Sequence, residues 1–81
     1  MENDNLSDAF QSLLGKATAA YERYDYSSAS KDFEAALQQA KDSGHKEIEI
    51  RATIGSGNVL RRQYDYQASL YTFEQALQIA H

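Results

Sequence analysis

The chain has 81 residues, a net charge of -4, no cysteine and no proline. This length suits one small domain with a modest core, so we take residues 1–81 as a single domain. The lack of cysteine excludes disulfides and thiolate chemistry, and the mildly acidic, mixed charge argues against nucleic acid or an anionic membrane as the partner.

Apolar residues at steps of three and four predict a first helix over about residues 6–24. Gly15 lies inside this helix, where glycine costs about 1 kcal/mol relative to alanine. A glycine within a helix often marks a place where another backbone or a ligand comes close. The apolar stripe of this helix comprises Leu6, Phe10, Leu13, Ala17, Ala20 and Tyr24.

A second helix is expected over about residues 26–42, with Asp25 as its N-cap. Gly44 follows it and can supply the left-handed residue that ends a helix. Small residues on its apolar side allow a neighbouring helix to approach, and Phe33 fills the space between them. This stripe comprises Ala29, Phe33, Ala36, Leu37 and Ala40.

A third helix over about residues 45–63 and a fourth over about 66–80 complete the chain, with Asp65 as the N-cap of the fourth. The third carries its apolar side on Ile50, Thr53, Ile54, Gly57, Val59 and Leu60, and the fourth on Ser69, Phe73, Ala76, Leu77 and Ala80. The short breaks near Asp25 and Asp65 predict two antiparallel helical hairpins. No strand-like alternation occurs, so the expected fold class is all-α.

The chain repeats itself at an offset of 40 residues. Tyr24-Asp25-Tyr26 returns as Tyr64-Asp65-Tyr66, and Phe33-Glu34 returns as Phe73-Glu74. A period in this range is typical of repeat proteins, which build a surface that holds a partner. We expect the four tyrosines of the two Tyr-Asp-Tyr segments to pack at the hairpin turns, and Tyr21 and Tyr71 to be freer to contact a partner.

The second copy resembles a tetratricopeptide repeat (TPR) through Gly57-Asn58-Val59, Tyr64-Asp65-Tyr66 and Phe73-Glu74-Gln75-Ala76-Leu77. The first copy matches through Ala17, Tyr26, Ala29, Phe33 and Ala36. The resemblance implies two TPR hairpins, about residues 6–42 and 45–80, stacked in a right-handed α-solenoid. The 40-residue spacing exceeds the usual 34, as in the long-repeat variant of the family, and Tyr24 and Tyr64 stand where the family often has glycine or asparagine.

A polar stripe on the third helix is the candidate binding site. Its members Arg51, Gly55, Asn58 and Arg62 share one helical face, with Arg61 nearby. Two guanidinium groups beside an amide suit a carboxylate, and Gly55 leaves room for a backbone to approach. By resemblance, this face lines the concave groove in which TPR proteins bind peptides. The alternative is a solvated basic face that balances the acidic helices.

No group of residues predicts an enzyme. His45 and His81 have no partners at metal-ligand or triad spacing. Gly55-Ser56-Gly57 lies in a helical pattern without the lysine of a phosphate loop. We therefore expect no catalytic residue, no metal and no cofactor.

The fourth helix is more apolar than the second, because Leu70, Tyr71 and Ile79 replace Ser30, Lys31 and Gln39. Together with Leu77 they form a candidate self-association face, which no following repeat covers. Either the chain is a fragment of a longer repeat array or this helix packs on a second molecule. We predict the second, a homodimer formed by face-to-face packing or by exchange of a hairpin.

The leading hypothesis is a protein–protein interaction module that binds a peptide or partner helix, of acidic character, in the TPR groove. The alternative is a self-assembly element that forms a homodimer or oligomer through the apolar last helix. The N-terminal segment MENDNLSD is unlike a signal peptide, and no apolar run has the length of a membrane span. We therefore expect a cytoplasmic protein.

Overall fold

The computed structural model describes the backbone of residues 2–81 and the side chains of residues 8–81. The described chain forms four α-helices: α1 (Glu2–Glu22), α2 (Tyr26–Ser43), α3 (Lys46–Arg62) and α4 (Tyr66–Ala80). No strand occurs in residues 2–81. The prediction of an all-α fold with four helices is confirmed, although α1 begins earlier than expected.

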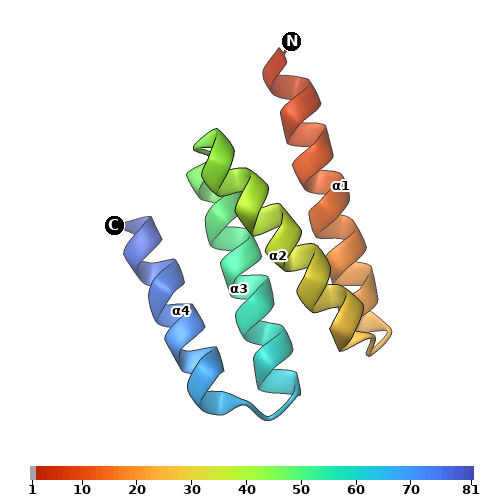
Figure 1. Ribbon diagram of the computed structural model, residues 1–81, viewed down its shortest axis with the longest axis vertical. Coiled ribbons are helices and arrows are strands. Elements are labelled where there is room, and N and C mark those ends of the chain that lie inside the picture. Colours follow the sequence, from red (N-terminus) through yellow and green to blue (C-terminus); the bar gives the residue numbers. More distant parts are fainter. Residues whose placement is uncertain (1) are drawn as a thin grey trace.

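Consecutive helices run antiparallel and lie side by side in chain order (Figure 1). α2 packs against both α1 and α3, whereas α1 and α3 touch only slightly. α4 packs against α3 and against no other helix of residues 2–81. One side of α1 and one side of α4 therefore lie uncovered at the two ends of the row.

The two hairpin turns have the same backbone geometry. Tyr24 and Tyr64 adopt left-handed φ angles of 65° and 66°, a conformation that costs a residue with a side chain about 1–2 kcal/mol. The next amides, at Asp25 and Asp65, donate to carbonyl oxygens five residues back at 2.9 Å in both turns. The repeated Tyr-Asp-Tyr segment therefore encodes one turn conformation.

The tyrosine rings at the turns contact each other but are less buried than expected. The ring centroids of Tyr24 and Tyr26 lie 6.4 Å apart, and those of Tyr64 and Tyr66 lie 6.2 Å apart. Only Tyr26 is half-buried, and the other three are largely exposed. The four tyrosines therefore pair at the hairpin turns, as expected, but three of the four rings stay on the surface beside the three-residue connections.

The core is built mainly from alanine around a few larger side chains. The stripes expected for α1 and α2 are largely confirmed, although Leu13 is only half-buried, Tyr24 is exposed in the turn and the side chain of Leu6 lies outside the described residues. On α4, Leu77 and Ala80 were expected on the apolar stripe but are exposed, because no helix of residues 2–81 packs against that side. On α3 the buried side includes Ala52 and Gly55, while Ile54, expected inside, is 42% exposed. The buried apolar residues are Phe10, Ala17, Ala20, Ala29, Phe33, Ala36, Ala40, Ala52, Val59 and Ala76.

Two phenylalanine rings pack directly against glycines of α3. A Cβ at Gly55 would fall within 3.0 Å of three ring carbons of Phe33, and a Cβ at Gly57 would meet the ring of Phe73 in the same way. The missing side chains thus let α2 and α4 each place a ring on the backbone of α3. A Cβ at Gly15 would meet no atom within 4 Å.

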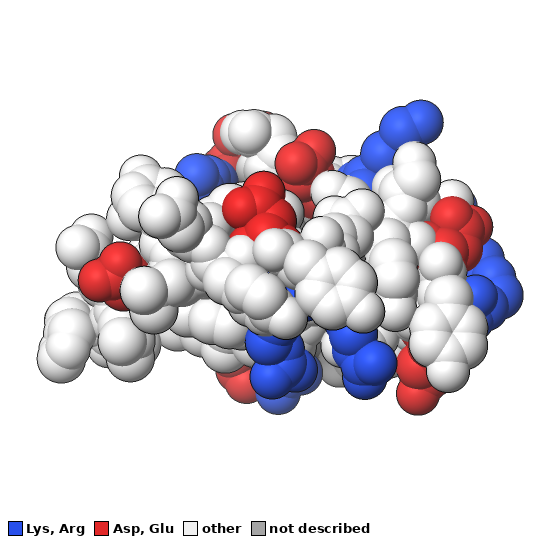
Figure 2. Space-filling model, turned by 90° about the horizontal axis from the view of Figure 1, so that it is seen from below, with Lys and Arg blue, Asp and Glu red and all other residues white. Residues whose placement is uncertain are grey.

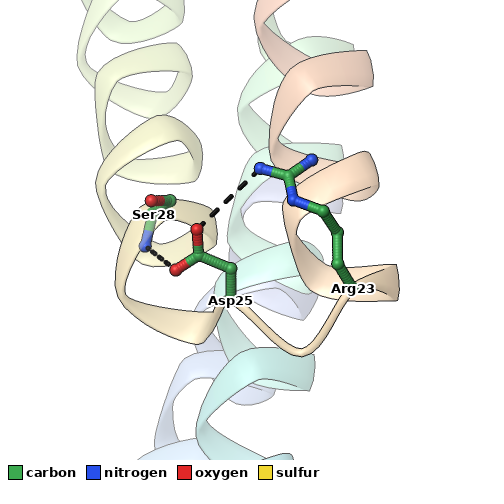
Figure 3. A network of polar contacts seen from close by, with 3 residues as sticks. All are labelled: Arg23, Asp25 and Ser28. Atoms are coloured by element: carbon green, nitrogen blue, oxygen red, sulfur yellow. Dashed lines mark hydrogen bonds and ion pairs between the residues drawn. The ribbon is translucent and has the colours of Figure 1, made fainter.

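Asp25 fixes the start of α2 (Figure 3). Its carboxylate accepts a hydrogen bond from the Ser28 amide at 3.3 Å and lies 3.8 Å from an Nη atom of Arg23. Hydrogen bonds from Ser28, and secondarily the charge of Arg23, lower the pKa of Asp25 below its ordinary value of 3.8. Asp65 caps α4 through the amide of Ala68, so both predicted N-caps are confirmed.

Replacing Gly55 with alanine is expected to destabilise the fold, although alanine is the better helix former. Overlap with the buried ring of Phe33 costs more than the gain in helix propensity, which leaves a net loss of about 1–2 kcal/mol in the free energy of unfolding. Denaturation followed by circular dichroism measures this loss. Gly15→Ala is the matched control and should gain up to about 1 kcal/mol. Equal gains in both variants would contradict the packing of Phe33 on Gly55.

The lowered pKa of Asp25 predicts an acid-sensitive turn. Because the carboxylate takes up a proton more readily in the unfolded chain, its contribution is fully present above about pH 4 and is lost as the pH falls through the folded-state pKa. The melting temperature should therefore fall more for the natural chain than for Asp25→Asn between about pH 6 and about pH 2.5. Asparagine keeps a cap acceptor but does not titrate, so equal falls would show that Asp25 is not responsible.

Candidate functional site

A shallow depression of about 360 Å³ lies between α1 and α3, the first helices of the two hairpins. Of the five residues predicted for a peptide groove, Arg51, Gly55 and Asn58 line it. Arg61 and Arg62 are exposed near the end of α3, outside the lining. The other lining residues are Leu14, Thr18 and Tyr21 from α1, Phe33 from α2 and Ile54 from α3.

Gly55 has a different role from the one expected. The ring of Phe33 occupies the space that a side chain at Gly55 would fill. That space is therefore used to pack α2 against α3, and it is not available to the backbone of a bound peptide. Leu14, Ile54 and the edge of Phe33 leave an apolar centre in the depression instead.

Arg62 is tied to α1 across the depression. Its Nε donates a hydrogen bond to the hydroxyl of Tyr21 at 2.9 Å, and its guanidinium carbon lies 5.4 Å from the centroid of the same ring. The hydrogen bond to Tyr21 raises the pKa of Arg62 above its ordinary value. Tyr21 is itself held by the ring of Tyr26, at a centroid distance of 5.9 Å.

Arg51 pairs with Glu47 one turn earlier on α3, with an N–O distance of 3.0 Å. Both side chains are mostly exposed, and ion pairs of this kind contribute about 0–1 kcal/mol. A carboxylate from a partner can therefore displace Glu47 at little cost. Arg51 and Arg62 are thus both exposed, and each has one polar partner within the molecule.

The pairing of Tyr21 with Arg62 was missed by sequence reasoning. The two residues lie 41 positions apart, and no local pattern connects them. The available signal was that Tyr21 lies on the face of the first helix that corresponds to the basic stripe. The contact could be predicted from this position only once α1 and α3 were known to be neighbours.

The four residues predicted for self-association do not share one depression. Leu77 lines an apolar groove of about 440 Å³ between α3 and α4, which we call the α3/α4 groove. Ile79 lines a separate depression on the side of α2 and α4, and Leu70 and Tyr71 line neither. The α3/α4 groove is formed by Ile50, Ile54, Phe73, Ala76, Leu77 and Ala80.

The two histidines have different surroundings. The ring of His45 packs edge-on against Phe10 at a centroid distance of 5.0 Å, and His81 is exposed. Residues 8–81 contain no group of three or more side chains suited to hold a metal ion. None of the helices described combines the length and apolar character that crossing a bilayer requires.

The end of the molecule that carries both hairpin turns has mixed charge. Figure 2 shows this end with basic and acidic side chains interspersed among uncoloured ones. No continuous field of one sign covers this face.

Comparisons with protein-family models, curated proteins and solved structures give no significant match. The basis for a functional proposal is therefore the geometry of this chain and its internal repeat.

Replacing Tyr21 with phenylalanine should release Arg62 while keeping the ring beneath it. The hydrogen bond at Nε is lost, so the Arg62 Nε–H proton should exchange with water faster in nuclear magnetic resonance spectra. Tyr71→Phe, on an exposed ring of α4, is the control and should leave this signal unchanged. Identical exchange in both variants would show that Tyr21 does not hold Arg62.

Proposed function

We propose that the chain is a two-repeat TPR protein-interaction module, stacked as a right-handed α-solenoid, that binds an acidic peptide segment in the depression between α1 and α3. The observation that carries the proposal is an apolar centre flanked on α3 by Arg51 and Arg62. The two hairpins with matching turns, and the placement of both first helices along the depression, support the TPR assignment.

The spacing of the two arginines limits the ligand. Arg51 and Arg62 lie eleven positions apart on α3, which corresponds to about 16 Å along the helix. An extended peptide covers that distance in about five residues. The proposed ligand therefore carries two carboxylates about five residues apart, with apolar side chains between them for the surface of Leu14 and Ile54.

Each polar group has a defined task in this proposal. Arg62 is held in place through Nε by Tyr21, and a bidentate carboxylate needs only two of the remaining N–H groups. Arg51 exchanges its exposed partner Glu47 for the second carboxylate. Asn58 supplies an amide that both donates and accepts, which suits the backbone of an extended peptide.

Binding of a dye-labelled peptide with carboxylates five residues apart and leucine between them tests the proposal. Reversing both arginines, Arg51→Glu with Arg62→Glu, should weaken binding about tenfold or more, because two charge-assisted contacts become repulsive. Raising the salt concentration from about 0.05 M to about 0.5 M should also weaken binding to the natural chain.

The matched control is Lys31→Glu with Lys41→Glu on α2. It changes the net charge by the same amount but lies outside the lining of the depression. This variant should bind within about twofold of the natural chain. Equal losses of peptide binding in the two double variants would show that the effect comes from net charge, and would contradict the proposed site.

A second candidate function is self-assembly, favoured by the α3/α4 groove. Leu77 is 63% exposed there and Ile54 is 42% exposed, an arrangement that monomers seldom leave uncovered. Packing of intact molecules is favoured over hairpin exchange. Gly44 ends α2 at a left-handed φ of 73°, and the amide of His45 donates to the Ala40 carbonyl at 2.9 Å, which holds the turn.

A further inference from the structure

The α3/α4 groove is the counterpart of a groove that is already filled in this molecule. Shifting its residues back by 40 positions gives a set on α1 and α2 that α3 covers. In that first set Phe10 is 1% exposed and Phe33 is 6% exposed, and α3 packs against α2 over it. The matching set comprises Phe10, Leu14, Phe33, Ala36, Leu37 and Ala40. We call each of these two helix-binding surfaces a seat: the first is the set on α1 and α2, and the second is the α3/α4 groove. α3 fills the first seat, and no helix of residues 2–81 lies in the second.

The way α3 packs in the first seat shows what kind of helix fits the second. α3 enters the first seat with small residues, of which Ala52 and Gly55 are buried, and the ring of Phe33 lies where a Cβ on Gly55 would be. Phe73 holds the place of Phe33 in the second seat. It packs on Gly57 and also lines the open groove. A helix that fills the α3/α4 groove in the same way therefore brings a glycine to the ring of Phe73.

α1 carries that glycine at the matching place. Gly15 corresponds to Gly55 in the 40-residue repeat, lies on the exposed part of α1 and has no atom within 4 Å of its Cβ position. Ser12 and Ala19, which correspond to Ala52 and Val59, are small and exposed as well. Gly15 has no packing role among the described residues, although it weakens its own helix.

We propose that a second copy of the chain seats its α1 in the α3/α4 groove, with Gly15 against Phe73 in the way that Gly55 lies against Phe33. This goes beyond peptide binding and rests on the second candidate function, self-assembly, to which it assigns a partner face and a register. Neither the depression between α1 and α3 nor a bound peptide is needed for it.

Charge complementarity supports this register. Within the molecule, Arg62 of α3 contacts Tyr21 of α1. In the 40-residue repeat, Glu22 corresponds to Arg62 and Arg61 corresponds to Tyr21. The same contact between copies therefore joins Glu22 of the second copy to Arg61 of the first. Both side chains are exposed in the single chain, so an ion pair forms where the molecule itself has a hydrogen bond.

A second pair of opposite charges follows from the same shift. Ser56 of α3 lines one depression together with Glu34 of α2. The corresponding residues between copies are Lys16 of the second copy and Glu74, and both are exposed. The same register thus places a second pair of opposite charges along one depression.

The resulting contact is head-to-tail. The groove and the exposed face of α1 are different surfaces, so every added copy leaves one of each free. Such a contact builds chains or closed rings and cannot stop at a two-fold dimer. The contact also lengthens the depression between α1 and α3, because α1 of the next copy lies beside α3 of the first copy.

Sedimentation of two single-sided variants, with no peptide present, tests the proposal. Leu77→Glu blocks the groove at an exposed position, and Gly15→Glu blocks the face of α1 where a side chain has open space. Mass should rise beyond a dimer with concentration for the natural chain. Each variant alone should stay monomeric, and an equimolar mixture should form a 1:1 complex, because one variant keeps its groove and the other keeps its α1 face.

Other outcomes contradict it. Association of Gly15→Glu alone would indicate face-to-face packing through the groove, and a monomeric mixture would exclude the head-to-tail contact. A natural chain that stays monomeric at high concentration would overturn self-assembly altogether while leaving peptide binding, measured separately with the dye-labelled peptide, untouched.

Two conservative variants test the register. Gly15→Ala should weaken association about tenfold or more while raising the melting temperature of the monomer, a pair of opposite effects that damage to the fold does not produce. Arg61→Glu and Glu22→Arg should each weaken association, and the chain that carries both should recover it. Failure of the double variant to recover would contradict the register.

Discussion

The packing of the Phe33 ring on Gly55 is the contact on which the rest of the structure depends. Because Gly55 has no side chain, α3 lies directly against the ring that projects from α2. This contact seats the second hairpin on the first. It brings α1 and α3 to either side of one depression, and it lets Arg62 reach Tyr21. A core made mostly of alanine has few other large contacts between the hairpins.

Local features of this fold could be predicted from the sequence. Helical periodicity, the caps at Asp25 and Asp65 and the glycine at Gly44 depend on residues near one another in the chain, so they gave the four helices and their breaks. Contacts between helices depend on how the helices lie in space. The ring at Gly55, the hydrogen bond from Arg62 to Tyr21 and the α3/α4 groove that Leu77 lines therefore needed the structure.

The internal repeat has two levels of meaning. The Tyr-Asp-Tyr segment, which is identical in both copies, determines the turns. In both turns its first tyrosine, Tyr24 or Tyr64, adopts a left-handed φ angle. Residues on the outer face of the first helix of each hairpin, such as Gly15 and Gly55, show which helix can occupy which seat. One seat is filled within the molecule, and the other gives the proposed copy-to-copy contact its geometry. The depression between α1 and α3 is a consequence of the filled seat.

The most direct measurement of the central contact is the nuclear Overhauser effect between the Gly55 Hα protons and the ring protons of Phe33 in a dilute solution. Stacking of the hairpins predicts strong cross-peaks and an upfield shift of the Gly55 Hα signals from the ring current, with Gly15 showing neither. Gly55 Hα signals at ordinary helical positions, without cross-peaks to Phe33, would mean that the second hairpin does not seat on the first, and that the depression between α1 and α3 does not exist in solution.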